Sequence, residues 1–334
     1  MKWEKSDQTN IGLDLSLFND RVTVGMDYFI KNTKDLLYDR PLHTTTGFSS
    51  ITQNIGSMRN TGFEFNVESH NIMNDRFSWD TQFNISTIKN KLTSLIDEKP
   101  IPVGNHVLQV GQPIGSFYMY KMDGIYQDNQ EVPENLCQGV RAGDIKYADK
   151  DNDGDLTPAD KEIVGKPLPD FFGGLTNRFR YGNFDLTIFN TFSVGNDVYA
   201  TGMGGIDAVG HNNYGMRKDI AANRWTGPGT NNSIPRAMIS THNTQASTYL
   251  LHDGSYFKFK DVTLGYTLPS NLTQKLNISN MRMYLSAQNL WTISSYPGYD
   301  PEVSYSVNNS KTMGEDAMTV PQLRTFVCGF NLTF

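Results

Sequence analysis

The sequence lacks any run of about 18 consecutive apolar residues, so it contains no segment that could cross a bilayer as a helix. Cysteine is scarce: Cys137 and Cys328 lie far apart in the sequence, which excludes a framework of disulfides and leaves at most one bridge. Basic residues are not in excess, because 29 Lys and Arg stand against 35 Asp and Glu, a net charge of −6. We therefore do not expect nucleic acid as a partner, since it would require a basic stripe.

Two further features are missing. Residues 1–5 carry no apolar segment of the kind found in signal peptides. A secreted protein without its signal would be an incomplete chain, whereas a cytosolic protein would never need one. Catalytic motifs are also absent: the six histidines are scattered, and the sequence has no His-Glu-x-x-His, no Gly-x-Ser-x-Gly and no Gly-Lys-Ser/Thr phosphate loop. We expect that the protein is not an enzyme.

Alternation of apolar and polar residues with a period of two is the dominant pattern that is present. In residues 21–31, for example, Val22, Val24 and Met26 alternate with polar or small residues. Such alternation places one set of side chains on each face of a strand. The blocks run about 9–13 residues, longer than typical soluble strands and close to the length of tilted membrane strands. They lie at 9–18, 21–31, 59–70, 77–88, 171–181, 184–193, 256–268, 280–292 and 322–334.

Short and long connections alternate between these blocks. Tight polar turns at Asn19-Asp20, Asn74-Asp75 and Gly182-Asn183 suit hairpins, and a moderate connection spans 269–280. The long connections are 33–57, 91–169, 194–255 and 295–319. Short turns at one end and long loops at the other are typical of outer-membrane barrels, whereas a soluble sandwich would show more even spacing. The sequence thus predicts an all-β fold, an antiparallel transmembrane β-barrel with long external loops.

The number of blocks predicts that this barrel is partial. The last block ends on Phe334, and a terminal aromatic residue on an amphipathic strand resembles the signal read by the barrel-assembly machinery. Counting back from it, with the tight turns on the periplasmic side, gives about nine strands, whereas single-chain bacterial barrels have even counts. The strand-like segment 116–126 would break this order, so we place it inside the external connection 91–169. We expect an open, curved sheet with unpaired edges.

The alternation also predicts which side chains face lipid and which face the lumen. Those expected to face lipid are Val22, Val24, Met26, Val262, Leu264 and Tyr266, and those expected to face the lumen are Thr23, Gly25, Asp27, Thr263 and Gly265.

An acidic segment at 149–160 has the spacing of a calcium-binding loop. Ca²⁺ prefers several oxygen ligands around one centre, and acidic residues at positions 1, 3, 5 and 12 with glycine at position 6 provide this arrangement. Position 7 would contribute its backbone carbonyl. An acidic turn without metal remains the alternative. The expected structural Ca²⁺ site comprises Asp149, Asp151, Asp153, Asp155 and Asp160, with Gly154 at the bend.

Short motifs along nearly the whole chain resemble the SusC/RagA family of TonB-linked outer-membrane transporters. Each motif is weak alone, but together they follow the family order. They include Lys2-Trp3-Glu4-Lys5, Asn10-Ile11-Gly12-Leu13-Asp14, Arg59-Asn60-Thr61-Gly62-Phe63-Glu64, Gly143-Asp144-Ile145-Lys146-Tyr147, Ile234-Pro235-Arg236, Asp253-Gly254-Ser255-Tyr256-Phe257-Lys258, Gln288-Asn289-Leu290-Trp291 and Gly298-Tyr299-Asp300-Pro301-Glu302.

The resemblance implies a 22-stranded barrel with an N-terminal plug, and residues 1–334 would be its C-terminal portion, without the plug and the first strands. It further implies an integral protein of the bacterial outer membrane, in contact with lipid, that imports oligosaccharides or peptides. Its partners would be a SusD-like lipoprotein and, through the missing plug, the TonB complex. The alternative is a secreted or surface-exposed β-rich binding protein with a calcium loop and no transport role. A sandwich of that kind would bury its apolar faces between two sheets.

Overall fold

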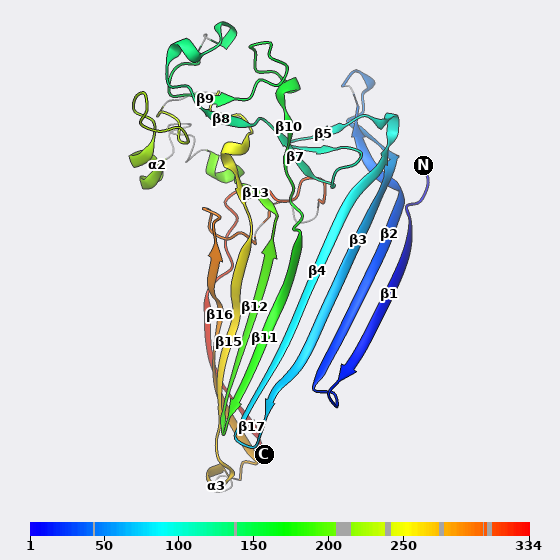
Figure 1. Ribbon diagram of the computed structural model, residues 1–334, viewed down its shortest axis with the longest axis vertical. Helices are drawn as coiled ribbons and strands as arrows, with labels where there is room; N and C mark the ends of the chain where they lie inside the picture. The colour runs from blue at the N-terminus through cyan, green and yellow to red at the C-terminus, as the bar shows by residue number, and fades with distance from the viewer. Residues whose placement is uncertain are drawn as a thin grey trace.

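A nine-stranded antiparallel sheet forms the body of the molecule in the computed structural model (Figure 1). The structure describes residues 1–42, 44–136, 139–204, 215–237, 242–273, 277–302, 304–305 and 309–334. All nine predicted strand blocks are confirmed. In sheet order the strands are β1 (Lys5–Leu17), β2 (Val22–Pro41), β3 (Ser50–Met73), β4 (Phe77–Leu95), β11 (Phe171–Tyr181), β12 (Phe184–Val194), β15 (Tyr256–Thr267), β16 (Asn280–Ser294) and β17 (Thr325–Thr333).

The sheet is curved and open. Within the described residues, β1 pairs only with β2 and β17 only with β16, so the two edge strands do not meet. This confirms the expected partial barrel. Unpaired edges of this length favour pairing with further strands, because they present rows of free backbone donors and acceptors.

β2, β3 and β4 are longer than the alternation predicted. The predicted long connection 33–57 is wrong, because β2 continues to Pro41 and β3 begins at Ser50. The pairing of β2 with β3 shifts register between Thr33 and Leu36, and Asp35 adopts a positive φ of 58°. A bulge of this kind adds an unpaired residue and interrupts the alternation while the strand itself continues. The other long connections begin and end within a few residues of their predicted bounds.

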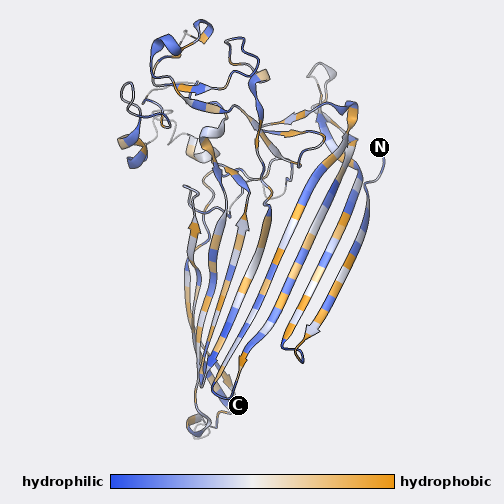
Figure 2. Cartoon of the chain, viewed as in Figure 1, coloured by the Kyte–Doolittle hydropathy of each residue, from blue (hydrophilic) through white to orange (hydrophobic). Residues whose placement is uncertain are grey.

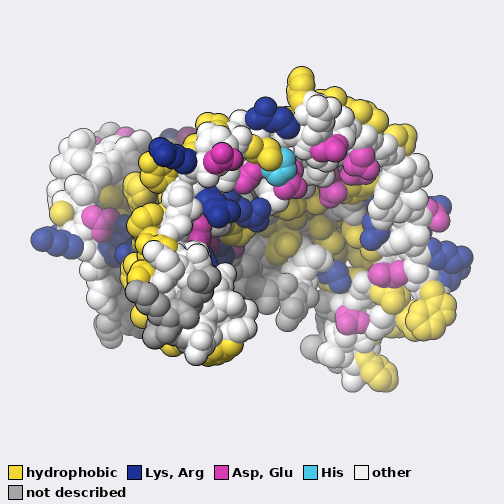
Figure 3. Space-filling view, turned by 90° about the horizontal axis from the view of Figure 1, so that it is seen from below, with side chains coloured by type: hydrophobic (Ala, Val, Ile, Leu, Met, Phe, Trp, Pro, Cys, Tyr) yellow, Lys and Arg dark blue, Asp and Glu magenta, His cyan; other side chains and the backbone are white. Residues whose placement is uncertain are grey.

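One face of the sheet is mainly apolar, with a few polar residues such as Asn190, which pairs with Leu175. Val24 pairs with Leu15 on one side and with Val67 on the other, and the same row continues through Phe83 and Leu175. Further along the sheet, a row at the same face comprises Leu186, Leu264, Leu285 and Cys328. The residues that we expected to face lipid all lie on this face. Figure 2 shows the alternation along each strand, and Figure 3 shows hydrophobic side chains along much of the outer rim.

The opposite face is polar and charged. The register places many ionisable side chains there, and some form pairs across strands: Arg282 donates to Asp185 at 3.0 and 2.5 Å. Gly265 lies beside this pair, where a Cβ atom would come within 2.4 Å of both side chains, so the glycine makes room for the ion pair. Other charged residues of this face are Asp14, Asp27, Glu64, Glu68, Asp80, Arg178 and Arg180.

Short turns and long connections lie at opposite ends of the sheet (Figure 1). At the short-turn end, Phe18, Asn19 and Asp20 adopt positive φ between β1 and β2, and Gly182 does so between β11 and β12. These residues therefore fit tight hairpins, as the sequence predicted. A short helix, α3 (Ser270–Thr273), lies in the moderate connection before β16.

The long connections fold into a small β-rich unit at the other end, which we call the loop cap (described residues 96–170 and 195–255). It contains one four-stranded and two two-stranded sheets. The segment 116–126 supplies two of its strands and lies outside the nine-stranded sheet, in the connection between β4 and β11. The strands are β5 (Ile101–Val103), β6 (His106–Leu108), β7 (Ser116–Met119), β8 (Met122–Ile125), β9 (Ile145–Tyr147), β10 (Glu162–Gly165), β13 (Asp197–Tyr199) and β14 (Leu251–Asp253).

Helices are few and short. The cap contains the short α-helix α2 (Lys218–Asn223), and no helix in the described part of the chain is long and apolar enough to span a bilayer. The 3-10 turns are η1 (Thr44–Thr46), η2 (Ile96–Glu98), η3 (Asn129–Glu131), η4 (Glu134–Leu136), η5 (Pro158–Asp160), η6 (Thr201–Met203) and η8 (Thr248–Leu250).

The cap has its own apolar core. Phe117 and Met119 of β7 are fully buried against Val198 and Tyr199 of β13, and Ile145 is buried beside Tyr147 in a second cluster. Burial of this kind stabilises a unit by about 1.5–3 kcal/mol for each large apolar side chain. The long connections are therefore folded structure and not loose loops.

Candidate functional site

Three of the five predicted calcium ligands converge. The carboxylate oxygens of Asp149, Asp151 and Asp153 lie within 4.8 Å of one another on the surface of the cap. Asp149 also fixes the turn, because its two oxygens accept hydrogen bonds from the backbone N–H groups of Asn152 at 2.6 Å and Gly154 at 2.9 Å. Gly154 has a φ of +78°, which suits glycine at the bend.

The other two residues do not join this group. The carboxylate of Asp155 takes no part in it, and its backbone N–H donates to Asp153; the predicted contribution of Asp155 is its backbone carbonyl. Asp160 is buried and accepts hydrogen bonds from the backbone N–H groups of Lys150 at 2.9 Å and Thr157 at 2.7 Å. Asp160 therefore closes the ends of the loop.

The electrostatics of the loop differ between these residues. Burial alone would raise the pKa of Asp160, but the hydrogen bonds from Thr157 and Lys150 outweigh it and lower the pKa. Desolvation, followed by repulsion from Asp153 and Asp160, raises the pKa of Asp151. A bound cation would relieve the repulsion between these carboxylates. The calcium site stays a prediction.

Calcium binding can be tested by calorimetry. Replacing Asp149 or Asp153 by alanine is expected to abolish Ca²⁺ binding, whose dissociation constant should be about 10⁻⁴–10⁻³ M as in other extracellular loops. Asp155→Ala is the matched control, because position 7 contributes a backbone carbonyl, and it should bind Ca²⁺ almost unchanged. Absence of any Ca²⁺ heat that depends on Asp149 would mean that the segment is only an acidic turn.

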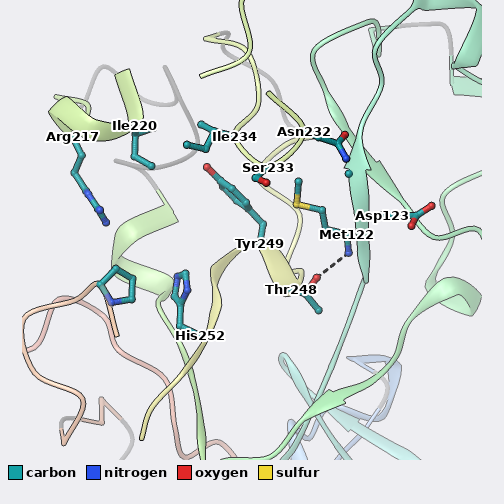
Figure 4. Close-up of a pocket in the computed structure, with 12 residues that line it drawn as sticks. Met122, Asp123, Arg217, Ile220, Asn232, Ser233, Ile234, Thr248, Tyr249 and His252 are labelled. Atoms are coloured by element: carbon teal, nitrogen blue, oxygen red, sulfur yellow. Dashed lines mark hydrogen bonds between the residues drawn. The ribbon is translucent and has the colours of Figure 1, made fainter. Parts of the chain in front are cut away.

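Sequence reasoning missed a polar pocket in the cap. It encloses about 660 Å³ between β8, α2, the segment 232–234 and β14 (Figure 4). Arg217 and His252 both line it, and Thr248 accepts a hydrogen bond from the backbone N–H of Met122 at 2.9 Å. No local motif signals this pocket, because its lining comes from segments up to 175 residues apart (122 to 297).

Buried ion pairs hold the cap and the long connections in place. Asp144 is fully buried and receives two hydrogen bonds of 2.9 Å from the guanidinium of Arg236, joining β9 to the segment 215–237. Lys258 of β15 is 1% exposed and donates to Asp300 at 2.9 and 3.1 Å and to Glu302 at 2.6 Å. The connection 295–324 is thereby fixed to the barrel wall.

The aromatic residues of the external connections divide into two kinds. Trp225 donates its indole N–H to Gln127, and Tyr296 is buried and donates its hydroxyl to Asp316 at 2.8 Å. Both are packing residues. Tyr299 and Tyr305 are about 70% exposed (69% and 70%) and are free to meet a ligand or a partner surface.

The family model described as TonB dependent receptor-like, beta-barrel matches residues 1–290. The chain belongs to this family. The curated relatives include TonB-dependent receptor P3 of Formosa agariphila, 36% identical over 350 residues, and TonB-dependent receptor SusC of Bacteroides thetaiotaomicron, 31% identical over 358 residues. Both matches cover all of this chain but only 34% and 32% of those proteins. This TonB-dependent receptor chain thus spans about a third of the length of its curated relatives.

A solved structure agrees with the family. The RagAB peptide transporter matches with a TM-score of 0.82 and 25% sequence identity, over all of this chain and 36% of that one. The resemblance to the SusC/RagA group is therefore confirmed. As a TonB-dependent receptor barrel, this chain is an integral outer-membrane protein, and its relatives are receptors and transporters, not enzymes.

Proposed function

We propose that this chain is the C-terminal part of a TonB-dependent transporter that imports oligosaccharide or peptide nutrients across the outer membrane. In this proposal residues 1–334 supply about nine strands of a longer barrel wall, and the plug and the first strands are supplied elsewhere in the protein. The loop cap faces the outside of the cell, and the short turns face the periplasm.

The continuous apolar face of the nine-stranded sheet is the observation that carries this proposal. Ile11, Phe63, Leu264 and Phe330 on that face have exposed fractions of 70%, 42%, 48% and 66%. A row of large apolar side chains so exposed is unfavourable in water and favourable against lipid. The charged opposite face suits a water-filled lumen. The binding-protein alternative needs a second sheet over the apolar face, and the described residues form no such layer.

Two partners follow from the same proposal. A SusD-like lipoprotein would dock over the loop cap, in keeping with the likeness to RagAB, which is named as a peptide importer. The TonB complex would act from the periplasmic side through the plug. The exposed Tyr299 and Tyr305 lie in the connection 295–324, on the side where such a lid would meet the barrel.

Uptake by whole cells tests the proposal. Deleting the gene should abolish growth on one class of nutrient, glycan or peptide, and spare growth on simple sugars and free amino acids. A protonophore should stop uptake in the wild type, because TonB draws on the inner-membrane proton gradient. Unchanged uptake of every oligomeric nutrient after deletion would overturn the transport role. Purification of the protein without any lipoprotein would overturn the proposed SusD-like partner.

A further inference from the structure

Three basic side chains gather on the outer face of the sheet, toward the end that bears the loop cap. They are Arg59 of β3 and Lys89 and Lys91 of β4, and all three are exposed. Arg59 lies on the same face as Phe63 and is paired with Lys91, and Lys89 lies on the same face as Ile85. We call these three residues the basic patch. β3 and β4 lie side by side along their whole length (Figure 1).

The basic patch lies where the apolar band of the outer face ends. Along β4 the outward residues run from Trp79, near the short turn, through Phe83 and Ile85 to Lys89. The segment from residue 79 to residue 89 rises roughly 25 Å along the membrane normal, at about 3.3 Å per residue and a tilt of about 40°. Because the apolar band of outer-membrane barrels has about this height, the patch lies at the level of the lipid headgroups.

No carboxylate neutralises the basic patch. Nε of Arg59 donates to the amide oxygen of Asn32 at 2.7 Å, and the patch forms no ion pair within the described part of the chain. Asp7 lies two strands from Arg59 in the same row, and it already pairs with Lys34 at 3.3 Å. Like charges directly opposite each other, as Arg59 and Lys91 are, destabilise a sheet. A bound anion would relieve this repulsion.

The other half of the sheet carries aromatic residues toward the same end of its outer face. Phe259 of β15 is paired with Trp291 of β16, and the two rings stack with their centroids 6.1 Å apart. Phe257 follows on the same face, nearer the cap. Aromatic residues are the usual side chains at this level of an outer-membrane barrel. The basic patch is therefore a property of the wall formed by β3 and β4 and not of the whole rim.

We propose that the basic patch binds the phosphate group of a phosphorylated lipid in the outer leaflet of the outer membrane. Arginine binds phosphate through two parallel N–H bonds, and lysine binds it as a point charge. Thr61, opposite Lys89, adds a hydroxyl group. The acyl chains would lie against Tyr28 and Phe63, which pair across β2 and β3 and are 44% and 42% exposed. This inference uses the orientation proposed above, with the loop cap outside the cell, and does not depend on which nutrient is imported.

Native mass spectrometry of the whole transporter, purified in detergent, tests the proposal because it counts the lipids that remain bound. Three probes are compared: monophosphoryl lipid A, the same lipid after removal of its phosphate, and glucose 1-phosphate as a phosphate without acyl chains. We expect one monophosphoryl lipid A to bind at least 10-fold more tightly than its dephosphorylated form. An equal concentration of glucose 1-phosphate should not displace it.

Variants of β2, β3 and β4 locate the binding. Arg59→Gln and Lys89→Gln should each weaken the phosphorylated lipid roughly 10-fold or more, the usual effect of losing a bond to a charged group. Lys91→Arg keeps the charge and should bind as the wild type does. The matched control is Lys31→Gln, because Lys31 is paired with Asn60 on the opposite face of the same sheet. It should change Kd less than twofold.

Three results would overturn the proposal. The first is an equal Kd for the phosphorylated and the dephosphorylated lipid. The second is a Kd that stays the same when all three residues of the basic patch are replaced by glutamine. The third is displacement by glucose 1-phosphate as effective as by the lipid itself, which would assign the patch to soluble phosphates. Any of these together with normal nutrient uptake would refute only the lipid site and leave the transport role intact.

Discussion

Asp300→Ala is expected to destabilise the protein by about 3 kcal/mol, at the lower end of the range for breaking a buried ion pair. The reason is that Lys258 is 1% exposed and would keep its charge without its main partner. Glu302 remains at 2.6 Å and limits the loss. The connection 295–324 should also detach from the barrel wall. The midpoint of denaturant unfolding in detergent measures the first effect, and limited proteolysis of the connection measures the second.

Two variants control this experiment. Asp7→Ala breaks the ion pair with Lys34, whose two side chains are 70% and 60% exposed, and should cost about 0–1 kcal/mol. The double variant Lys258→Met with Asp300→Leu removes both charges of the buried pair and should recover most of the lost stability. If Asp300→Ala and Asp7→Ala had the same small effect, Lys258 would not depend on the buried network.

Val24→Arg is expected to destabilise the protein in a bilayer by about 2–4 kcal/mol, because the side chain would enter lipid near mid-membrane. Val24 lies between Leu15 and Val67 on the apolar face. Thr23→Arg should cost little, since Thr23 lies on the polar face opposite Glu68. Unfolding in lipid vesicles measures both values.

The comparison within this pair is what tests the orientation of β2. The two residues are neighbours in one strand, so backbone propensity and chain position are matched. Equal costs at the two positions would contradict the orientation, and a larger cost at Thr23 would reverse it.

The strands could be predicted because the alternation and the turn residues that produce them are local in the sequence. The period of two in residues 21–31 places Val24 and Thr23 on opposite faces whatever the rest of the chain does, and Gly182-Asn183 forms its hairpin from its own backbone preferences. The acidic loop is local in the same way, and its spacing predicted that Asp149, Asp151 and Asp153 would converge.

The remaining features depend on contacts between distant segments. The part of β2 after the bulge at Asp35 was not predicted from the sequence, because one extra residue reverses the alternation that follows. The contact between Lys258 and Asp300 joins residues 42 apart. Arg217 and His252 line one pocket only because α2 and β14 fold into the same cap. A sequence shows such residues but not their proximity.

Site-directed spin labelling along β2 and β15 can show directly whether one face of this sheet meets lipid. With Cys137 and Cys328 replaced by serine, single cysteines at residues 22–27 and 262–266 are labelled in vesicles, and their accessibility to oxygen and to a water-soluble nickel complex is measured. We expect a period of two, with Val22, Val24, Met26, Val262, Leu264 and Tyr266 accessible to oxygen, and Thr23, Gly25, Asp27, Thr263 and Gly265 accessible to nickel. Uniform accessibility to nickel on both faces, or protection of the apolar face from both reagents, would contradict it.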